Sequence, residues 1–325
     1  MAKRKVNIVG KSMDRWIFRR MVEEITASEI FEVSTTVEPL SEADLYHFFR
    51  PRDAQSALKK GWSKRFVTTL HGVLPGATDF EGNAEAYSRA EAVAAVSEDG
   101  KQYLVSSGIP AERVRVIHAG ADPKRFFRSR WPQGHFTIGV ASRYYGVHGR
   151  VEDNKGGGTI LEVMRILAER EVEAMLLVAG TGWRWLAEAL SRIPFPMVYY
   201  ERGRNCTYVD YPRLYNMMDC LLIASKFEGG PVAAYEAMIC GRPLVSTAVG
   251  VVPELVSEGQ TGHIFPQGDA QACAELLLKL RDERDEWAQE RWRKPAARAQ
   301  GFTWNRWRRL HEELYEDALD GGTGR

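Results

Sequence analysis

The segment 226–245, KFEGGPVAAYEAMICGRPLV, contains the residues whose types and spacing most directly suggest chemistry. It follows an apolar run, MDCLLIAS, and places Gly229, Gly230 and Pro231 before a helical pattern. Glycines let the backbone approach a ligand closely, and proline favours the first turn of a helix. Because the free amides and the dipole of a helix start attract anions, the pattern predicts a diphosphate site from Gly229 to Val232.

Two glutamates flank this helix start at a spacing of eight positions. Glu228 precedes the glycines, and Glu236 lies two helical turns later in an otherwise apolar stretch. A carboxylate in such a stretch is costly unless it is paired or bound to a ligand. Glu236 is therefore a candidate binding residue. The alternative is a partly exposed glutamate on a helix that crosses over a sheet.

The ordered set of motifs resembles the retaining glycosyltransferases of family 4, also described as glycosyl transferases group 1. Glu228 and Glu236 match the family's E-x7-E element, and the strand ending at His71 resembles the one that carries its active-site histidine. IGVASRYY followed by NKGGG resembles the start of the family's donor domain. Other similar stretches are 93–126, 249–265 and 301–319. The resemblance implies a GT-B fold that binds a nucleotide sugar between two Rossmann-like domains.

The resemblance also implies roles for individual residues. Arg143 and Lys155 would bind the donor diphosphate and neutralise charge on the leaving group. Glu236 would accept hydrogen bonds from the ribose hydroxyls. Glu228 and the amides after it would hold the transferred sugar, which His71 would also contact.

One departure from the family concerns the cations. The insertion between them, 144–154, is longer than usual, so Arg150 is a fallback for Lys155.

The family's chemistry implies retention of the anomeric configuration, with the departing diphosphate taking the proton of the acceptor. The sequence has no D-x-D pair of the metal-dependent transferases. We therefore expect no metal and no cofactor, because the two cations replace the metal electrostatically. The donor would be a nucleoside diphosphate sugar. UDP is slightly favoured over GDP by its frequency in the family.

Other functions remain open at this stage. Gly180-Thr181-Gly182 follows an apolar run and forms part of a dinucleotide fingerprint, but Trp185 occupies the place of its third glycine. A nicotinamide-dependent oxidoreductase is thus a remote alternative, and Gly180 fits a sugar-nucleotide site equally well. A nucleotide-sugar epimerase or hydrolase, and a non-catalytic sugar-nucleotide-binding module, would use the same fold.

These residues need a scaffold, and the chain alternates short apolar runs with helical patterns, which predicts an α/β protein with two parallel sheets. We expect an acceptor domain over 1–128, a donor domain over 136–300, and a last helix over 301–319 that returns to the first domain. Strands are predicted at 6–9, 31–36, 45–49, 66–70, 92–96, 114–117, 136–141, 175–179, 197–200, 220–224 and 244–246. Helices are predicted at 13–25, 98–107, 159–168, 232–239, 269–281, 284–299 and 304–319.

Composition narrows the setting. Lys plus Arg (44) and Asp plus Glu (43) nearly cancel, so net charge predicts no nucleic-acid partner. Four cysteines without a C-x-x-C pair indicate reduced thiols. Without a signal peptide or an apolar span of membrane length, we expect a cytoplasmic protein.

The acceptor stays open: a glycan, a lipid-linked or small molecule, or a nucleic acid. Trp287, Trp292, Trp304 and Trp307 lie among many arginines. This region predicts either a face for peripheral membrane or nucleic-acid contact, or ordinary helix packing.

Overall fold

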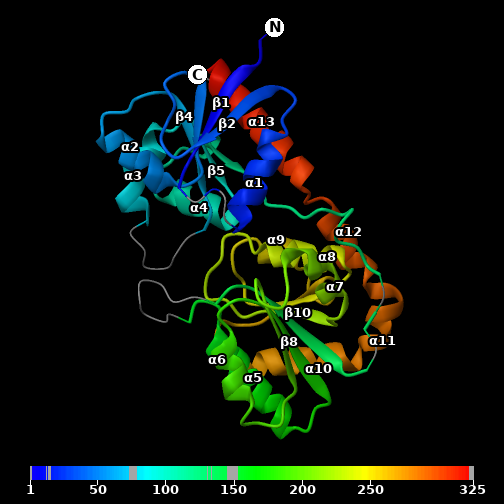
Figure 1. Cartoon of the computed structure of the whole chain (residues 1–325). Helices are drawn as coiled ribbons and strands as arrows, with labels where there is room; N and C mark the ends of the chain where they lie inside the picture. Colours follow the sequence, from blue (N-terminus) through cyan, green and yellow to red (C-terminus); the bar gives the residue numbers. More distant parts are fainter. Residues whose placement is uncertain are drawn as a thin grey trace. The chain divides into compact units, whose positions relative to one another are not determined.

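The computed structural model describes residues 2–11, 13, 16–72, 79–129, 131–132, 134–144 and 153–321. The chain forms two compact units (Figure 1). Unit 1 comprises 1–120 and 302–325, and unit 2 comprises 121–301. The first unit thus ends eight residues before the predicted boundary at 128. The last helix groups with unit 1.

Unit 1 is built on a six-stranded parallel sheet with the strand order β2-β1-β3-β4-β5-β6. The three strands from β3 to β5 are buried along their whole length, as expected of parallel strands covered on both faces. The apolar runs at these positions therefore specified central strands correctly. The strands are β1 (Arg4–Val9), β2 (Phe31–Thr36), β3 (Leu45–Phe48), β4 (Phe66–Leu70), β5 (Ala92–Ala95) and β6 (Val114–Val116).

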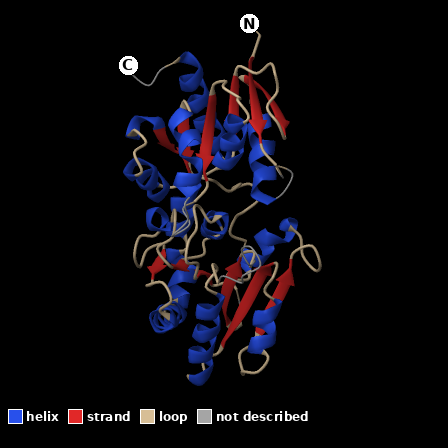
Figure 2. Cartoon of the chain, turned by 90° about the vertical axis from the view of Figure 1, so that its left-hand side faces the viewer, coloured by secondary structure: helices blue, strands red, loops and turns tan. Residues whose placement is uncertain are grey.

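Helices cover both faces of this sheet (Figure 2). Neither α2 (Pro51–Lys59) nor α3 (Asp79–Arg89) was predicted from the sequence. The helix α13 begins after the N-cap Thr303, whose side chain accepts a hydrogen bond from the Arg306 amide. A Cβ atom on Gly120 would lie 2.4 Å from the Thr303 carbonyl carbon, so only glycine allows this close approach. The helices are α1 (Trp16–Thr26), α2 (Pro51–Lys59), α3 (Asp79–Arg89), α4 (Glu98–Ser106), the 3-10 turn η1 (Ala111–Arg113) and α13 (Trp304–Asp320).

Unit 2 repeats the architecture with the strand order β12-β11-β10-β7-β8-β9. The chain reverses its direction of sheet growth between β7 and β10, and ligands of such sheets bind beside the carboxyl ends of strands at this point. The strands are β7 (Phe136–Ala141), β8 (Ala174–Gly180), β9 (Met197–Glu201), β10 (Cys220–Ile223), β11 (Leu244–Ser246) and β12 (Gly262–Ile264). The last of them was not predicted.

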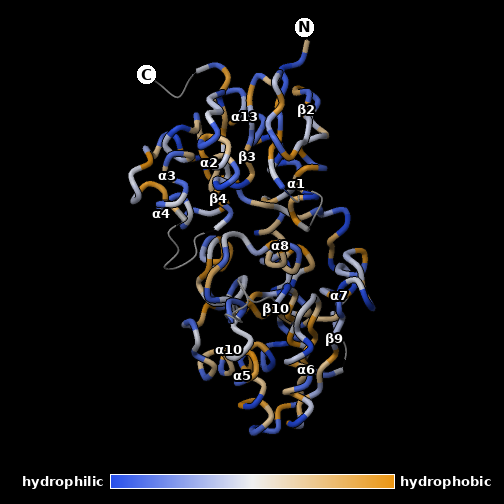
Figure 3. Tube along the Cα trace, turned by 60° about the vertical axis from the view of Figure 1, so that its left-hand side comes forward, coloured by the Kyte–Doolittle hydropathy of each residue, from blue (hydrophilic) through white to orange (hydrophobic). Residues whose placement is uncertain are grey.

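One face of this sheet packs on α5 and α10. The helix α12 packs on α8, which Figure 3 colours as mainly hydrophobic. The predicted helix 284–299 is instead three pieces. The helices are α5 (Gly157–Glu169), α6 (Arg184–Leu190), the 3-10 turn η2 (Tyr208–Asp210), α7 (Tyr211–Asn216), α8 (Val232–Ile239), α9 (Val252–Leu255), α10 (Ala270–Asp282), α11 (Arg284–Glu286), the π-helix η3 (Trp287–Arg291) and α12 (Arg293–Gln300).

The tryptophans near the C-terminus belong to the cores of the two units. Trp287, Trp304 and Trp307 are at most 3% exposed, and Trp292 is half-buried. The guanidinium of Arg128 lies 4.4 Å from the Trp292 ring centre. Burial of three of the four tryptophans contradicts an exposed aromatic face, so helix packing explains these residues. Contact with a membrane or a nucleic acid stays a prediction. Within the described residues, no helix combines the length and apolarity needed to span a membrane.

Candidate functional site

Two chain segments meet at the edge of the unit 2 sheet where β7 and β10 end. The Lys226 amide donates to the Asn154 carbonyl oxygen at 2.7 Å. Gly156 has a φ of 66°, and a Cβ atom there would lie 1.9 Å from the Ala224 carbonyl oxygen. Both the left-handed backbone and the close approach require glycine. The segment that carries Lys155 is therefore held against the end of β10.

This approach brings Lys155 and Glu228 together, as two of the predicted site residues. The Lys155 ammonium forms an ion pair with Oε1 of Glu228, and both side chains are mostly buried. The Ser225 hydroxyl donates to the same carboxylate oxygen at 2.9 Å. The sequence analysis did not single out Ser225, although it ends the apolar run before the glycines. The pair places a cation and a carboxylate at the predicted ligand edge.

The start of α8 is open in a way that a neighbouring helix start is not. The N-cap residue of α8 is Pro231, and no described side chain caps the helix. In α5, by contrast, the Asp153 carboxylate accepts from the amides of Gly157 and Gly158, the latter at 2.8 Å. An anion attracted to this edge would therefore meet an internal carboxylate at α5 and uncapped amides at α8.

The glycines before α8 are braced by the next loop. The Val251 amide donates to the Gly229 carbonyl oxygen at 3.0 Å, and a Cβ atom on Gly250 would lie 2.0 Å from that oxygen. Gly229 is buried, while Gly230, Pro231 and Val232 are half-exposed. The predicted diphosphate segment thus has a rigid base and an accessible backbone.

Glu236 is 2% exposed, so the alternative of a partly exposed glutamate is wrong. Its Oε1 accepts from the Tyr208 hydroxyl, and its Oε2 accepts from the Tyr215 hydroxyl at 2.8 Å. Burial raises the pKa of Glu236 to about 7, although the two tyrosines and the guanidiniums of Arg125 and Arg202 oppose the shift. The predicted ribose contact stays a prediction, since both oxygens have partners within the chain.

The two tyrosines and Arg125 are site residues that the sequence analysis missed. The connection from β9 through α7 contains Tyr208, Tyr211 and Tyr215 within eight positions. This tyrosine cluster after a strand end was an available signal. The Arg125 guanidinium lies 4.2 Å from the Tyr208 ring centre and donates to the Tyr208 carbonyl oxygen.

Gly180 lies close to the backbone of the segment after β7, and its predicted contact with the donor stays a prediction. A Cβ atom on Gly180 would lie 1.8 Å from the Ser142 carbonyl oxygen, and the Tyr144 amide donates to the Thr181 carbonyl at 2.8 Å. Gly180 therefore lets the segment after β7 lie across the end of β8. That segment carries Arg143, whose side chain is exposed. Gly180 positions this segment of the chain.

His71 follows β4 in unit 1, whereas the other predicted site residues lie in unit 2. Its ring packs edge-on against Phe18 and Phe49, with centroid distances of 5.0 and 6.4 Å. Burial and the nearby Arg50 lower the pKa of His71 to about 4, so its ring is neutral at pH 7.

Three further observations concern predictions made from the sequence. Arg150 lies outside the described residues. In the described part of the chain, no group of three or more His, Cys, Asp or Glu side chains could hold a metal. All four cysteines are free and buried.

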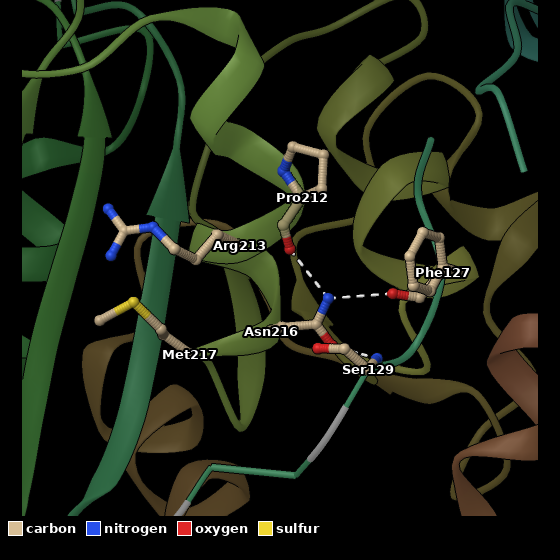
Figure 4. A pocket seen from close by; sticks show the side chains of 6 residues that line it. All are labelled: Phe127, Ser129, Pro212, Arg213, Asn216 and Met217. Carbon is tan, nitrogen blue, oxygen red and sulfur yellow. Dashed lines mark hydrogen bonds between the residues drawn. The ribbon is translucent and has the colours of Figure 1, made fainter. Parts of the chain in front are cut away.

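A cavity of about 310 Å³ lies elsewhere in unit 2, between α7 and the segment 127–129 (Figure 4). Asn216 points into it and donates to the carbonyl oxygens of Phe127 and Pro212 at 2.9 and 2.8 Å. None of the predicted site residues that the structure describes lines this cavity. It is therefore separate from the ligand edge.

Comparisons with known proteins fit this geometry. The family model described as Glycosyltransferase Family 4 matches residues 16–125, and the model described as Glycosyl transferases group 1 matches residues 142–283. The chain belongs to the family 4 glycosyltransferases. Both halves of the family pattern are therefore present, in the family's order.

Among curated members of family 4, the chain is 28% identical over 207 residues to the amylovoran biosynthesis glycosyltransferase AmsK of Erwinia amylovora, covering 60% of this chain and 48% of that protein. It is 24% identical over 245 residues to D-inositol 3-phosphate glycosyltransferase 1 of Catenulispora acidiphila, covering 72% and 58%. The matched part thus spans about half the length of these relatives.

Solved structures share the fold. The sucrose-phosphate synthase of Thermosynechococcus elongatus aligns with a TM-score of 0.81 at 15% identity, covering 98% of this chain and all of that one. HepE of Anabaena, in complex with UDP and glucose, aligns with a TM-score of 0.76 at 16% identity, covering 97% and 100%. The fold of this chain is GT-B.

Proposed function

We propose that this chain transfers a glycosyl group from a nucleoside diphosphate sugar to an acceptor hydroxyl, with retention and without a metal ion. The observation that carries the proposal is the start of α8, which no side chain in the described part of the chain caps, beside the Lys155–Glu228 pair. The same helix carries the buried Glu236. Anion-binding amides, a cation and a carboxylate at the switch point of a parallel sheet fit a sugar diphosphate and its pentose.

Family membership and fold support this choice of substrate. HepE of Anabaena has been solved with UDP and with UDP-glucose, and its fold matches this chain closely. AmsK is named as a biosynthesis glycosyltransferase. We favour UDP over GDP as the nucleotide of the donor. Four buried, free cysteines suit a reducing compartment such as the cytoplasm.

In the proposed reaction, the bond between the anomeric carbon and the diphosphate oxygen breaks as the acceptor oxygen bonds to the same face. The acceptor proton passes to the departing diphosphate oxygen, so no protein nucleophile is needed. Lys155 and Arg143 neutralise charge that grows on the leaving group. Glu228 accepts hydrogen bonds from the sugar.

The oxidoreductase alternative lacks support in unit 2. A dinucleotide site would use a carboxylate at the end of the next strand for the ribose. Glu201 holds that place, but its carboxylate pairs with Arg184 at 3.1 Å and Arg204 at 3.5 Å. Trp185 stands in the position where the dinucleotide fingerprint needs its third glycine. Its side chain also packs against Gly157.

The experiment combines binding with product analysis. Calorimetric titration of the full chain with UDP, GDP and NAD identifies the ligand, and incubation with the matching sugar nucleotide, alone and with candidate acceptors, identifies the product. Transfer with retention supports the proposal. Sugar release without an acceptor would favour a hydrolase, and a changed sugar would favour an epimerase. Binding without turnover would favour a non-catalytic module.

A matched pair of variants tests the site itself. We expect Lys155→Ala to lower the turnover number by about 100-fold, because it removes a cation that stabilises the leaving group. Lys279→Ala removes the same charge from the exposed face of α10 and should leave turnover unchanged. Equal turnover in the two variants would remove Lys155 from the reaction.

A further inference from the structure

The two tyrosines that bind Glu236 differ in how they are held. Tyr215 lies in α7, is 1% exposed, and donates to Oε2 at 2.8 Å. Tyr208 opens the 3-10 turn η2, is half-exposed, and donates to Oε1. A molecule that approaches Glu236 from solvent therefore meets Tyr208 first.

Tyr208 is held at the surface by charged neighbours. The guanidinium of Arg125 lies 4.2 Å from its ring centre and that of Arg202 lies 5.8 Å away. Its turn is closed by a capping box in which Thr207 and Asp210 exchange hydrogen bonds. Cation–π contacts and a cap are individually weak. The Tyr208 carbonyl oxygen also accepts a hydrogen bond from Arg125, so the backbone of the turn is held and only the phenol must move to release Glu236.

The phenol of Tyr208 and the hydroxyls of a pentose offer the same chemistry to a carboxylate. In both cases an O–H group donates a hydrogen bond to a carboxylate oxygen. Because Glu236 is buried and Tyr215 already satisfies Oε2, the oxygen within reach of an incoming sugar is Oε1. That oxygen is occupied by Tyr208. A carboxylate oxygen can accept two hydrogen bonds, but Glu236 is buried, so a pentose reaches Oε1 by taking the place of the Tyr208 side chain, and the two donors compete for that place.

We propose that Tyr208 is an internal competitor of the donor nucleotide. In the unliganded chain it takes the position on Oε1 of Glu236 that the ribose takes on binding, and it leaves when the donor arrives. Tyr215 stays in place and positions the carboxylate. This inference rests on the proposed function, since it assigns a nucleotide to the Glu236 site.

When only a fraction of the protein molecules is in the conformation that can bind a ligand, the apparent affinity for that ligand is reduced by the same fraction. A hydrogen bond to a buried carboxyl oxygen is strong enough to leave the released state a minor one. Removing the Tyr208 hydroxyl should thus tighten UDP binding by roughly 5- to 30-fold. Removing the Tyr215 hydroxyl should instead weaken it, because Glu236 loses the partner that fixes its orientation.

The test is calorimetric titration of UDP into the wild-type chain, Tyr208→Phe and Tyr215→Phe, with GDP as a second probe and thermal melts to confirm folding. The two variants lose the same group from the same carboxylate, so each controls for the other. The proposal requires a lower Kd for Tyr208→Phe and a higher Kd for Tyr215→Phe.

Three outcomes overturn it. An unchanged or higher Kd for Tyr208→Phe shows that Tyr208 does not compete, while the proposed function stands. Equal tightening in both variants shows that Glu236 simply binds better with fewer partners. Absence of UDP and GDP binding in all three proteins removes the proposed function along with the inference. A crystal structure of the UDP complex gives an independent readout: Tyr208 still bonded to Oε1 would also refute the competition.

Discussion

Acid should weaken unit 1 through a buried histidine of α13. His311 is 1% exposed, and its Nδ1 donates to the Trp307 carbonyl oxygen at 2.9 Å. Its Nε2 is buried and has no hydrogen-bond partner among the residues that the structure describes. A proton added there would create a buried charge with no acceptor. Burial accordingly lowers the pKa of His311 from 6.5 to about 4, and the nearby His71 adds to the shift.

The sign and size follow from linkage. Since the pKa in the folded state lies below that of the unfolded chain, the stabilising contribution is complete above pH 6.5 and is lost as the pH falls towards 4. At pH 5 the unfolded chain is mostly protonated at this residue and the folded chain is not. The free energy of unfolding should therefore fall by about 2 kcal/mol at pH 5 on account of His311, and by about 3 kcal/mol at pH 4.

The assay compares the wild type with His311→Asn, whose amide can still donate to the Trp307 carbonyl oxygen. Urea unfolding followed by circular dichroism gives the free energy of unfolding at pH 7.5 and pH 5.0. We expect the wild type to lose about 2 kcal/mol more than the variant between these values. The change with pH is the readout, so a lower stability of the variant at both values does not matter.

A control variant, His135→Asn, removes an imidazole from the surface of unit 2 and should follow the wild-type profile. If His311→Asn loses as much stability as the wild type between the two pH values, His311 does not resist protonation and the burial argument is wrong. His47 could then account for any acid sensitivity, because burial and His311 keep its pKa well below the usual value.

Two further predictions concern unit 2. Gly156→Ala should cost roughly 2–5 kcal/mol in unfolding free energy and misplace Lys155, because its methyl group would meet the Ala224 carbonyl oxygen at 1.9 Å. Gly203→Ala has a similar φ of 84° with open space around it, so urea unfolding should show a cost of only about 1 kcal/mol; equal costs would contradict the steric argument. Dialysis against EDTA should leave the rate of glycosyl transfer unchanged, and activity that is lost and then restored by Mg²⁺ would contradict the metal-free mechanism.

Much of the fold could be predicted from the sequence, because apolar runs and helical patterns report burial directly. The runs that end at Leu70 and Ala141 became central strands as expected. The sequence patterns did not predict elements that are only partly buried or very short. The helices α2 and α3 are mostly polar, and β12 has only three residues. The tryptophans near the C-terminus suggested an exposed face although most of them are buried. Sequence composition does not say which face of a helix is covered by other elements.

The site was predicted to the extent that it depends on residues near one another in the chain. The glycines after Glu228 and the helix that carries Glu236 follow from local pattern. The pairing of Lys155 with Glu228 depends on contact across 73 positions, and that of Tyr208 with Glu236 depends on contact across 28. Such contacts require the strand order of the sheet, which only the three-dimensional structure provides.

The difference between the two helix starts explains why this edge would hold a diphosphate on one side only. Asp153 lies just before α5, and its carboxylate accepts hydrogen bonds from the first amides of that helix. At α8 the corresponding stretch is Glu228-Gly229-Gly230-Pro231, in which the glycines and proline offer no side-chain oxygen, and Glu228 is turned to Lys155 and Ser225. The helix dipole attracts anions equally at both starts. Side chains that cap or fail to cap therefore decide where a negatively charged ligand can bind.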